Sequence, residues 1–365
     1  MKNTLPYILC SGSHYEIGFT HGKEGRAYIE KSIGCYKAMF RDYSAVEWDK
    51  ACSFAMTFIP SIEKYDSDIM EEIRGIADGS GFGLSEILAL NLRSEIVLES
   101  EQIDDILSGG CSALGLTPYI TVDEKVWIGQ DWDWKHEAGD ALLLLEIHQK
   151  EKPDILMITE AGIVGKIGLN SCGVGVCLNA LGSDDRVEGE TLPLHIALRG
   201  VLNSYTLSDA IGRAGQTPLA CCANFLMGSD SGQVVTVEIG HGMIDVIYAD
   251  DGYAVHTNHF YGPRTVNIND TGRISFPDTF LRLGRLRDMI KHRLPKKFTL
   301  EDIKTMLRDH VGYPDSICRH PDPHDAPEKR IETLFSIIMD LKKRELHYTA
   351  GNPCENEYIT AFLDK

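Results

Sequence analysis

Gly109-Gly110-Cys111-Ser112-Ala113-Leu114-Gly115 is the stretch on which the predicted fold and chemistry of this chain depend. It follows a segment with helical spacing and precedes a run that alternates like β-strands. Glycine has no Cβ and tolerates strained backbone dihedrals, so Gly110 allows the Cys111 thiol to approach the carbonyl of its own preceding peptide bond. Most glycine-cysteine pairs are turns followed by a buried thiol. The rest of the sequence must therefore decide whether Cys111 is a reactive nucleophile or an ordinary buried thiol after a turn.

Attack of this thiol on the carbonyl would cut the chain. An N-to-S acyl shift followed by hydrolysis would leave Cys111 at a new N-terminus. Its free α-amine, with an ordinary pKa of about 7.7–8.0, would then serve as general base for the thiol of the same residue.

The hundred or so residues before this junction have helical patterning. Apolar residues at i, i+4, i+7 and i+11 mark one helix face, namely Ile29, Ile33, Tyr36 and Phe40. Ser85 is a candidate cap for a second helix that runs through Leu92. Four acidic residues then mark a solvent-exposed connection that would suit later cleavage, namely Glu99, Glu101, Asp104 and Asp105.

The pattern changes after Cys111. Short strand candidates are Val126–Ile128, Ala141–His148, Ile155–Thr159, Gly173–Leu178, Val234–Ile239 and Met243–Tyr248. Helix candidates are Leu192–Leu202 and Phe280–His292. Groups of antiparallel strands with helices between the groups predict a layered α+β domain.

Several blocks of this sequence also occur together, and in the same order, in a known family. Three of them are Gly129-Gln130-Asp131-Trp132-Asp133-Trp134, Val255-His256-Thr257-Asn258-His259 and Tyr313-Pro314-Asp315-Ser316-Ile317-Cys318-Arg319. Others are residues 15–22, 72–77, 159–166, 178–181, 195–199 and 333–338. At these positions the chain resembles the isopenicillin N acyltransferase family (acyl-CoA:6-aminopenicillanic-acid acyltransferases), whose members are N-terminal nucleophile hydrolases. The resemblance covers nearly the whole chain.

This resemblance implies a four-layer αββα sandwich in which the nucleophile opens the first strand of a central sheet. It also implies cleavage between Gly110 and Cys111. Residues 1–110 would then form a helical N-terminal fragment and residues 111–365 the catalytic fragment. The two fragments are expected to remain associated.

The roles of the site residues are likewise carried over from the family. Cys111 would be the nucleophile, and Asp133 would hold its ammonium through charge-assisted hydrogen bonds. Arg319 would favour the thiolate. Asn258 would donate to the oxyanion, with Asn179 as a second donor.

Without the resemblance, each of these residues has an ordinary structural interpretation. Asp133 would be an acid at a strand end, Arg319 a surface arginine, and the two asparagines turn residues. The chain also departs from the family pattern at two places. Gly109 stands where members commonly have aspartate, and Asp131 where they tend to have asparagine.

Composition and charge bound the possible partners. The 365 residues include 54 acidic and 36 basic ones, a net charge of −18 that argues against nucleic acid or an anionic membrane as partner. No uninterrupted apolar run reaches the roughly 18–20 residues that span a bilayer. With no signal peptide and no C-terminal peroxisomal signal, we expect a cytoplasmic protein. We expect no cofactor, although acyl-CoA is a possible substrate.

The ten cysteines do not suggest a disulfide framework or a zinc site, because the sequence contains no CxxC pair. Two histidine pairs have helical spacing, His256 with His259 and His320 with His324, but both lie beside strand or proline signals. We therefore predict no bound metal.

Two functional hypotheses follow. The first is an autoprocessed cysteine acyltransferase or amidohydrolase, which moves an acyl group from a small amide or acyl thioester through a Cys111 thioester to an amine or water. The alternative is an unprocessed, non-catalytic ligand-binding protein with the same fold. A thiol-redox or metal protein ranks last, because the paired-cysteine spacing is missing.

Overall fold

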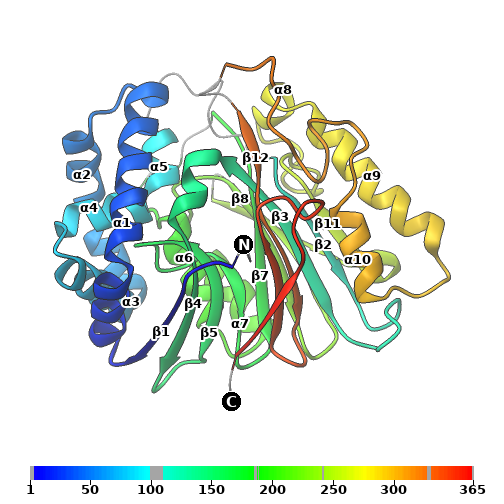
Figure 1. The fold of residues 1–365 in the computed structure, drawn as a ribbon, viewed down its shortest axis with the longest axis horizontal. Coiled ribbons are helices and arrows are strands. Elements are labelled where there is room, and N and C mark those ends of the chain that lie inside the picture. The colour runs from blue at the N-terminus through cyan, green and yellow to red at the C-terminus, as the bar shows by residue number, and fades with distance from the viewer. Residues whose placement is uncertain are drawn as a thin grey trace.

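Two β-sheets packed face to face form the centre of the molecule, and helices cover both outer faces (Figure 1). The computed structural model describes residues 4–98, 110–184, 187, 189–240, 242–326 and 330–363. Strands β2 and β3 of one sheet pack against β7 and β8 of the other. The layers are therefore helix, sheet, sheet and helix, which confirms the predicted α+β class and αββα sandwich.

The first sheet has eight strands in the order β1-β4-β5-β6-β7-β8-β9-β10. All neighbouring strands are antiparallel except β1 and β4, which run parallel with Tyr7 beside Leu144. The strands are β1 (Tyr7–Gly12), β4 (Leu142–Gln149), β5 (Ile155–Glu160), β6 (Ile167–Asn170), β7 (Val174–Ala180), β8 (Ala223–Ser229), β9 (Val234–Gly240) and β10 (Met243–Tyr248).

The second sheet has six strands in the order β11-β2-β3-β12-β13-β14, all antiparallel. They are β2 (Ser112–Leu116), β3 (Trp127–Lys135), β11 (Tyr253–His256), β12 (Ile331–Asp340), β13 (Glu345–Ala350) and β14 (Ile359–Phe362). Cys111 directly precedes β2, whose first residue, Ser112, pairs with Asp131 of β3. The cysteine thus lies at the start of a strand in one of the two central sheets, as the resemblance implied.

The helices divide between the two outer faces (Figure 1). On the first sheet lie α1 (His14–Ser44), α2 (Trp48–Met56), α3 (Ile59–Ser80), α4 (Leu84–Asn91), α5 (Arg93–Leu98), α6 (Leu194–Leu202) and α7 (Leu207–Gly215). On the second lie α8 (Gly272–Ser275), α9 (Asp278–Arg293) and α10 (Leu300–Leu307). Short 3-10 turns occupy His136–Ala141 and Asp250–Gly252.

Two of the sequence blocks shared with the family bring α1 and α3 into close contact. A Cβ at Gly18 would lie 1.9 Å from the carbonyl oxygen of Glu72, and one at Gly75 would lie 2.2 Å from that of Tyr15. No side chain fits at such distances, so the two glycines are required for the backbones to approach. These blocks therefore have a structural explanation.

The helix face predicted from spacing is confirmed, because Ile29, Ile33, Tyr36 and Phe40 are all buried on α1. The predicted downstream strands and helices are present to within a few residues, except that the strand predicted at Val126–Ile128 continues to Lys135 as β3 and contains Asp133. The predicted cap at Ser85 is wrong. The N-cap of α4 is Gly83, and its N–H donates to Oε2 of Glu86 at 3.0 Å, which fixes the first turn before Ser85 is reached.

The expectation of an entirely helical N-terminal segment needs one correction, because β1 belongs to the first sheet. Its pairing with β4 joins chain on either side of Cys111. The division after residue 110 stays a prediction. The acidic connection at Glu99, Glu101, Asp104 and Asp105, and also Gly109, lie outside the described residues.

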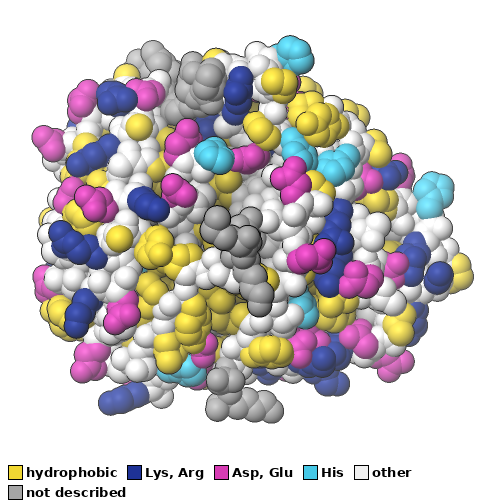
Figure 2. Space-filling view, viewed as in Figure 1, with side chains coloured by type: hydrophobic (Ala, Val, Ile, Leu, Met, Phe, Trp, Pro, Cys, Tyr) yellow, Lys and Arg dark blue, Asp and Glu magenta, His cyan; other side chains and the backbone are white. Residues whose placement is uncertain are grey.

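Acidic and basic side chains are interspersed over the face seen in Figure 2, and neither sign dominates it. Among the helices that the structure describes, none has the length and apolar character needed to cross a bilayer.

Candidate active site

Cys111 lies between the two sheets and is 3 % exposed. Its Sγ is 3.8 Å from the backbone carbonyl oxygen of Asp133 on the adjacent strand β3. Burial, followed by the nearby Asp133 carboxylate, raises the pKa of the Cys111 thiol to about 12. In the intact chain the sulfur is therefore a protonated thiol at neutral pH.

Gly110 packs against two side chains that the sequence placed in the site. A Cβ at Gly110 would lie 2.1 Å from Nε of Arg319 and 2.5 Å from Oδ2 of Asp133. The φ of Gly110 lies outside the left-handed region. Glycine is thus required here because there is no room for a side chain, and the expected dihedral freedom is not the reason.

The Asp133 carboxylate lies between Thr333 and Arg319. Its Oδ1 accepts a hydrogen bond from the Thr333 hydroxyl at 2.7 Å, and its Oδ2 lies 3.4 Å from Nε of Arg319. Burial raises the pKa of Asp133 to about 6, against the lowering effects of Arg319 and the Thr333 hydroxyl. Within the described residues, no group donates a hydrogen bond to Oδ2 of Asp133, and this oxygen lies beside Gly110.

Arg319 is held by three acids and by the side chain of Thr333 on β12. Its guanidinium pairs with Asp133, Asp278 and Asp315, and its N–H donates to the Thr333 hydroxyl at 2.9 Å. The residue is 3 % exposed. This fixed cation, placed against Gly110, is not the surface arginine of the alternative interpretation.

Arg282 is a member of this group that the sequence did not reveal. Its Nη1 donates to the carbonyl oxygen of Gly110 at 2.6 Å, to that of Cys111 at 2.8 Å and to the Ser112 hydroxyl at 3.1 Å. Its Nε donates to Asp278 at 2.7 Å. The guanidinium therefore contacts the peptide oxygens on both sides of the cysteine.

A signal for Arg282 was present in the sequence. It shares a helical face, at i, i+4 and i+8, with Leu286 and Ile290, both of which are buried. A charged residue on the apolar face of a helix needs a buried partner, because an unpaired buried charge is costly. An arginine at this position therefore indicates a buried polar site.

Both predicted asparagines adjoin the same group. Nδ2 of Asn179 donates to the carbonyl oxygen of Cys111 at 3.1 Å, and its Oδ1 accepts from Asn224 at 3.0 Å. Oδ1 of Asn258 accepts from Nη2 of Arg282 at 3.0 Å, while its Nδ2 donates to the carbonyl oxygen of Ala180 at 3.0 Å. The structure thus brings Cys111, Asp133, Asn179, Asn258 and Arg319 together, although the Asn258 donor is already engaged.

The histidines near Asn258 have structural partners. Nε2 of His256 pairs with Glu238 at 2.9 Å, and Nδ1 of His259 lies 2.9 Å from the Thr279 hydroxyl. Neither ring is needed for the group around Cys111.

Comparison with known proteins places this chain in a family. Residues 121–355 match the family described as acyl-coenzyme A:6-aminopenicillanic acid acyl-transferase. The 40 kDa form of acyl-coenzyme A:6-aminopenicillanic-acid-acyltransferase from Emericella nidulans is 30% identical over 351 residues, which are 95% of this chain and 93% of that protein. The chain belongs to the acyl-coenzyme A:6-aminopenicillanic acid acyltransferase family.

Two solved structures are similar to this chain over part of its length. A variant of conjugated bile acid hydrolase from Clostridium perfringens covers 70% of this chain and 98% of its own, with 15% identity and a TM-score of 0.46. Penicillin V acylase from Agrobacterium tumefaciens covers 66% and 83%, with 14% identity and a TM-score of 0.46. At such low sequence identities and TM-scores, neither structure bears on the chemistry of this member of the acyltransferase family.

Asp131, where the resemblance led us to expect asparagine, is a buried acid. Asp131 is completely buried on β3 opposite Ser336, and burial raises the pKa of its carboxyl well above the ordinary value. A protonated carboxyl has one hydrogen-bond donor and one carbonyl acceptor, as an asparagine side chain also offers. The protonated form of Asp131, which burial favours, thus resembles the asparagine that the family resemblance led us to expect at this position.

An apolar cavity adjoins Cys111 in this acyltransferase-family chain. Side chains from β3, β7, α5, α6 and the neighbouring loops line the cavity. They include Arg93, Trp132, Trp134, Leu178, Leu181, Leu194 and Cys221. Its volume of about 30 Å³ accommodates water-sized molecules only. An acyl group can enter only if part of the wall moves.

A buried charge cluster supports one wall of this cavity. Glu160 pairs with Lys166 and lies 3.3 Å from Arg93, and Nζ of Lys166 lies 3.5 Å from the ring centroid of Trp132. Burial would raise the pKa of Glu160, but Arg93 and Lys166 lower it to about 2. The cluster explains why the block at residues 159–166 carries both an acid and a base.

Proposed function

We propose that this chain is an autoprocessed cysteine acyltransferase or amidohydrolase, with Cys111 as its nucleophile. The observation that carries the proposal is the contact between Arg282 and the Gly110 carbonyl oxygen, 2.6 Å from Nη1. A guanidinium at that oxygen stabilises negative charge as it develops there. The Asp133 carboxylate and the Arg319 cation against Gly110 complete the group.

In the cleavage step, the Cys111 thiol loses its proton to Asp133 and the sulfur attacks the Gly110 carbonyl carbon. The oxygen becomes an oxyanion held by Arg282. The C–N bond then breaks and the nitrogen takes up a proton, which leaves Gly110 as a thioester on the sulfur. Water hydrolyses this thioester and gives a Gly110 carboxylate, a free thiol and a free Cys111 amine.

The acyl-transfer cycle reuses the same groups. The Cys111 amine takes the thiol proton, and the thiolate attacks the carbonyl carbon of an amide or thioester donor. The departing amine or thiol receives that proton as the acyl group forms a thioester with Cys111. Water or an amine then attacks this thioester, releases the product and returns the proton to the sulfur. Asp133 binds the protonated α-amine of Cys111 during the cycle. Asn258 and Asn179 donate hydrogen bonds to the oxyanion that forms at the attacked carbonyl.

The cavity supports an apolar acyl group on the donor. Trp132, Trp134, Leu178 and Leu181 surround the approach to Cys111. The Emericella relative is named for an acyl-coenzyme A donor and an amine acceptor, 6-aminopenicillanic acid. We propose the same classes here, an acyl thioester or N-acyl amide as donor and an amine or water as acceptor.

The fragments would stay together after cleavage. The segment before residue 110 contributes β1 to the first sheet, and its helices share one continuous apolar core with residues from the other segment. Separation would expose both the strand edge and this core.

The deciding experiment is the intact mass of the purified protein. Cleavage predicts fragments of 110 residues and 365 − 110 = 255 residues. The Cys111→Ala variant is expected to remain full length. Processed protein is then incubated with N-acyl amides and acyl thioesters, with and without amine acceptors, and Cys111 is examined for an acyl adduct by mass spectrometry. A full-length wild type that forms no adduct would favour the ligand-binding alternative.

A further inference from the structure

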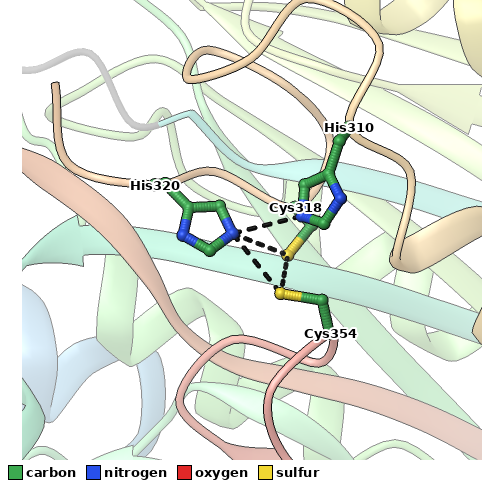
Figure 3. A group of neighbouring side chains, drawn as sticks. All are labelled: His310, Cys318, His320 and Cys354. Carbon is green, nitrogen blue, oxygen red and sulfur yellow. Dashed lines mark hydrogen bonds between the residues drawn. The ribbon is translucent and has the colours of Figure 1, made fainter.

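Four potential metal ligands meet in one place in the structure, with their side chains pointing toward one another (Figure 3). His310, Cys318 and His320 belong to the connection between α10 and β12, and Cys354 belongs to the connection between β13 and β14. The ligand atoms of all four residues lie within 4.8 Å of one another. Cys318 is buried, His320 is half-buried, and His310 and Cys354 are exposed.

The separations between these atoms match the edges of a tetrahedron. The two sulfurs are 3.6 Å apart, and Nε2 of His310 lies 3.1 Å from Nε2 of His320. Nε2 of His320 is 3.8 Å from Sγ of Cys318 and 3.4 Å from Sγ of Cys354. Zinc bond lengths of about 2.3 Å to sulfur and 2.0–2.1 Å to nitrogen give tetrahedral edges of roughly 3.8 Å between sulfurs and roughly 3.3 Å between nitrogens.

We propose that His310, Cys318, His320 and Cys354 bind one divalent zinc ion. Two thiolates balance the charge of the ion, and thiolate with imidazole is a ligand set that favours zinc over magnesium or calcium. Four protein ligands leave no open position, so the site is structural.

Neighbouring groups orient the ligands before any metal binds. Nδ2 of Asn352 lies 3.7 Å from Sγ of Cys318, as a donor to a ligating thiolate would. The N–H of Cys318 donates to the carbonyl oxygen of Asp309 at 3.1 Å, and that of His320 donates to Pro314 at 3.0 Å. The Cys318 sulfur and the backbone of Cys318 and His320 are therefore positioned by contacts within the protein.

A disulfide between Cys318 and Cys354 explains less of this arrangement. It would need a sulfur–sulfur distance of about 2.05 Å and would leave the two imidazoles without a role. A metal ion accounts for the convergence of all four side chains.

The site would tie two segments together beside the candidate active site. Arg319 lies between two of the ligands in the sequence, and its carbonyl oxygen accepts from Asn352 at 2.7 Å. Zinc would thus join the segment that carries Arg319 to the turn between β13 and β14. The proposal does not depend on the proposed function.

The test is metal analysis of the full-length gene product, purified with a non-thiol, non-chelating reductant and then equilibrated with zinc and desalted. Wild type is expected to retain one zinc per chain. Cys354→Ser and His310→Gln are expected to lose most of it, while the matched controls Cys172→Ser and His324→Gln should retain it. His324 is a suitable control because its ring is exposed and pairs with Asp322 in the same connection.

Cobalt substitution gives a second readout that does not depend on activity. A tetrahedral site with two thiolates should show intense visible bands and sulfur-to-cobalt charge transfer in wild type, and Cys354→Ser should lose them. Far-ultraviolet circular dichroism checks that each variant is folded. Absence of bound zinc in folded wild type, equal zinc in folded Cys354→Ser, or a Cys318–Cys354 disulfide under reducing conditions would each overturn the proposal.

Discussion

Arg282 donates from Nη1 to the carbonyl oxygen of Gly110 at 2.6 Å, so α9 contacts the peptide bond that we propose is cut. The same nitrogen reaches the Cys111 carbonyl oxygen at 2.8 Å. Asp278 fixes the guanidinium through Nε, and Asn258 accepts from Nη2. A cation held in advance at a carbonyl oxygen stabilises an oxyanion without reorganising during the reaction.

Replacing Arg282 with lysine should slow self-cleavage by roughly 10²-fold, the loss typical of one oxyanion donor. Lysine keeps the charge, but it cannot donate to Gly110, Asp278 and Asn258 in the fixed directions of a guanidinium. The measurement is the rate of fragment appearance from precursor made by cell-free synthesis. Arg293→Lys, at the end of the same helix, is the control. Cleavage of Arg282→Lys at the control rate would remove Arg282 from the mechanism.

Gly110→Ala should slow cleavage by at least tenfold while the protein remains folded. The new methyl group would lie 2.1 Å from Nε of Arg319 and 2.5 Å from Oδ2 of Asp133, so both side chains must move away from the peptide. Gly284→Ala is the matched control, because a Cβ there meets no atom within 4 Å. The same time course compares the two variants, and equal rates would show that the contacts around Gly110 do not matter.

Self-cleavage should accelerate as pH rises, with a midpoint near the Asp133 pKa of about 6. The carboxylate form takes the Cys111 proton, and the charged groups that set its pKa after burial are Arg319, Arg282 and Asp278. Asp133→Asn should abolish this midpoint and lower the rate by at least tenfold, about 1.4 kcal/mol of barrier. A pH profile of the variant that still shows the wild-type midpoint would assign it to another group.

The same pKa shift has an opposite consequence for stability. The folded state raises the pKa of Asp133 above its ordinary value of 3.8, so it binds this proton more tightly than the unfolded chain does. The stabilisation from this carboxyl is complete below pH 3.8 and is lost as pH rises toward 6. The ionisation that favours cleavage therefore works against folding.

Lys166→Met should destabilise the protein by about 3 kcal/mol, because Glu160 would lose one of its two buried cationic partners. The substitution also removes the cation above Trp132. Denaturant unfolding in the Cys111→Ala background keeps the chain in one piece. Lys64→Met, which breaks the exposed ion pair between Lys64 and Glu190, should lower the free energy of unfolding by less than about 1 kcal/mol. Similar losses in the two variants would show that the buried cluster contributes no special stability.

Much of the fold could be predicted because the strands and helices carry their own periodicity. The face of α1 through Ile29 and Phe40 and the strands β9 and β10 match the expected segments. β1 was missed because its neighbours in sequence are helical and its pairing partner, β4, lies far away along the chain. Such a pairing is a tertiary property that local pattern does not encode.

The site could be predicted only in part, for the same reason. The family blocks named Asp133 and Arg319, and the structure places both against Gly110. Arg282 lay outside those blocks, and only its place on an apolar helix face distinguished it. The group of His310, Cys318, His320 and Cys354 has no CxxC or paired-histidine spacing, since two separate connections bring the ligands together. The prediction that the chain holds no metal therefore rested on local sequence features, namely the cysteine spacing and the strand and proline signals beside the histidine pairs.

Asn258→Ala should lower kcat of the processed protein by roughly 10²–10³-fold, as expected for one oxyanion donor. In the intact chain Nδ2 of Asn258 donates to the carbonyl oxygen of Ala180 at 3.0 Å, and Ala180 also lines the cavity beside Cys111. To assist acyl transfer, the Asn258 amide must donate to an oxyanion formed at the cavity wall. It can do so by turning toward the oxyanion or by donating its second Nδ2 hydrogen.

An interaction made only in the transition state lowers kcat and leaves KM nearly unchanged. The assay is therefore steady-state turnover of an N-acyl amide by protein whose processing has been confirmed by mass. Asn269→Ala is the control, since its Nδ2 donates at the surface to Asp184 at 2.7 Å. Because Asn258 also accepts from Arg282 at 3.0 Å, the variant could impair cleavage as well as turnover. Only fully processed Asn258→Ala separates the two effects, and wild-type turnover by that protein would exclude this asparagine as an oxyanion donor.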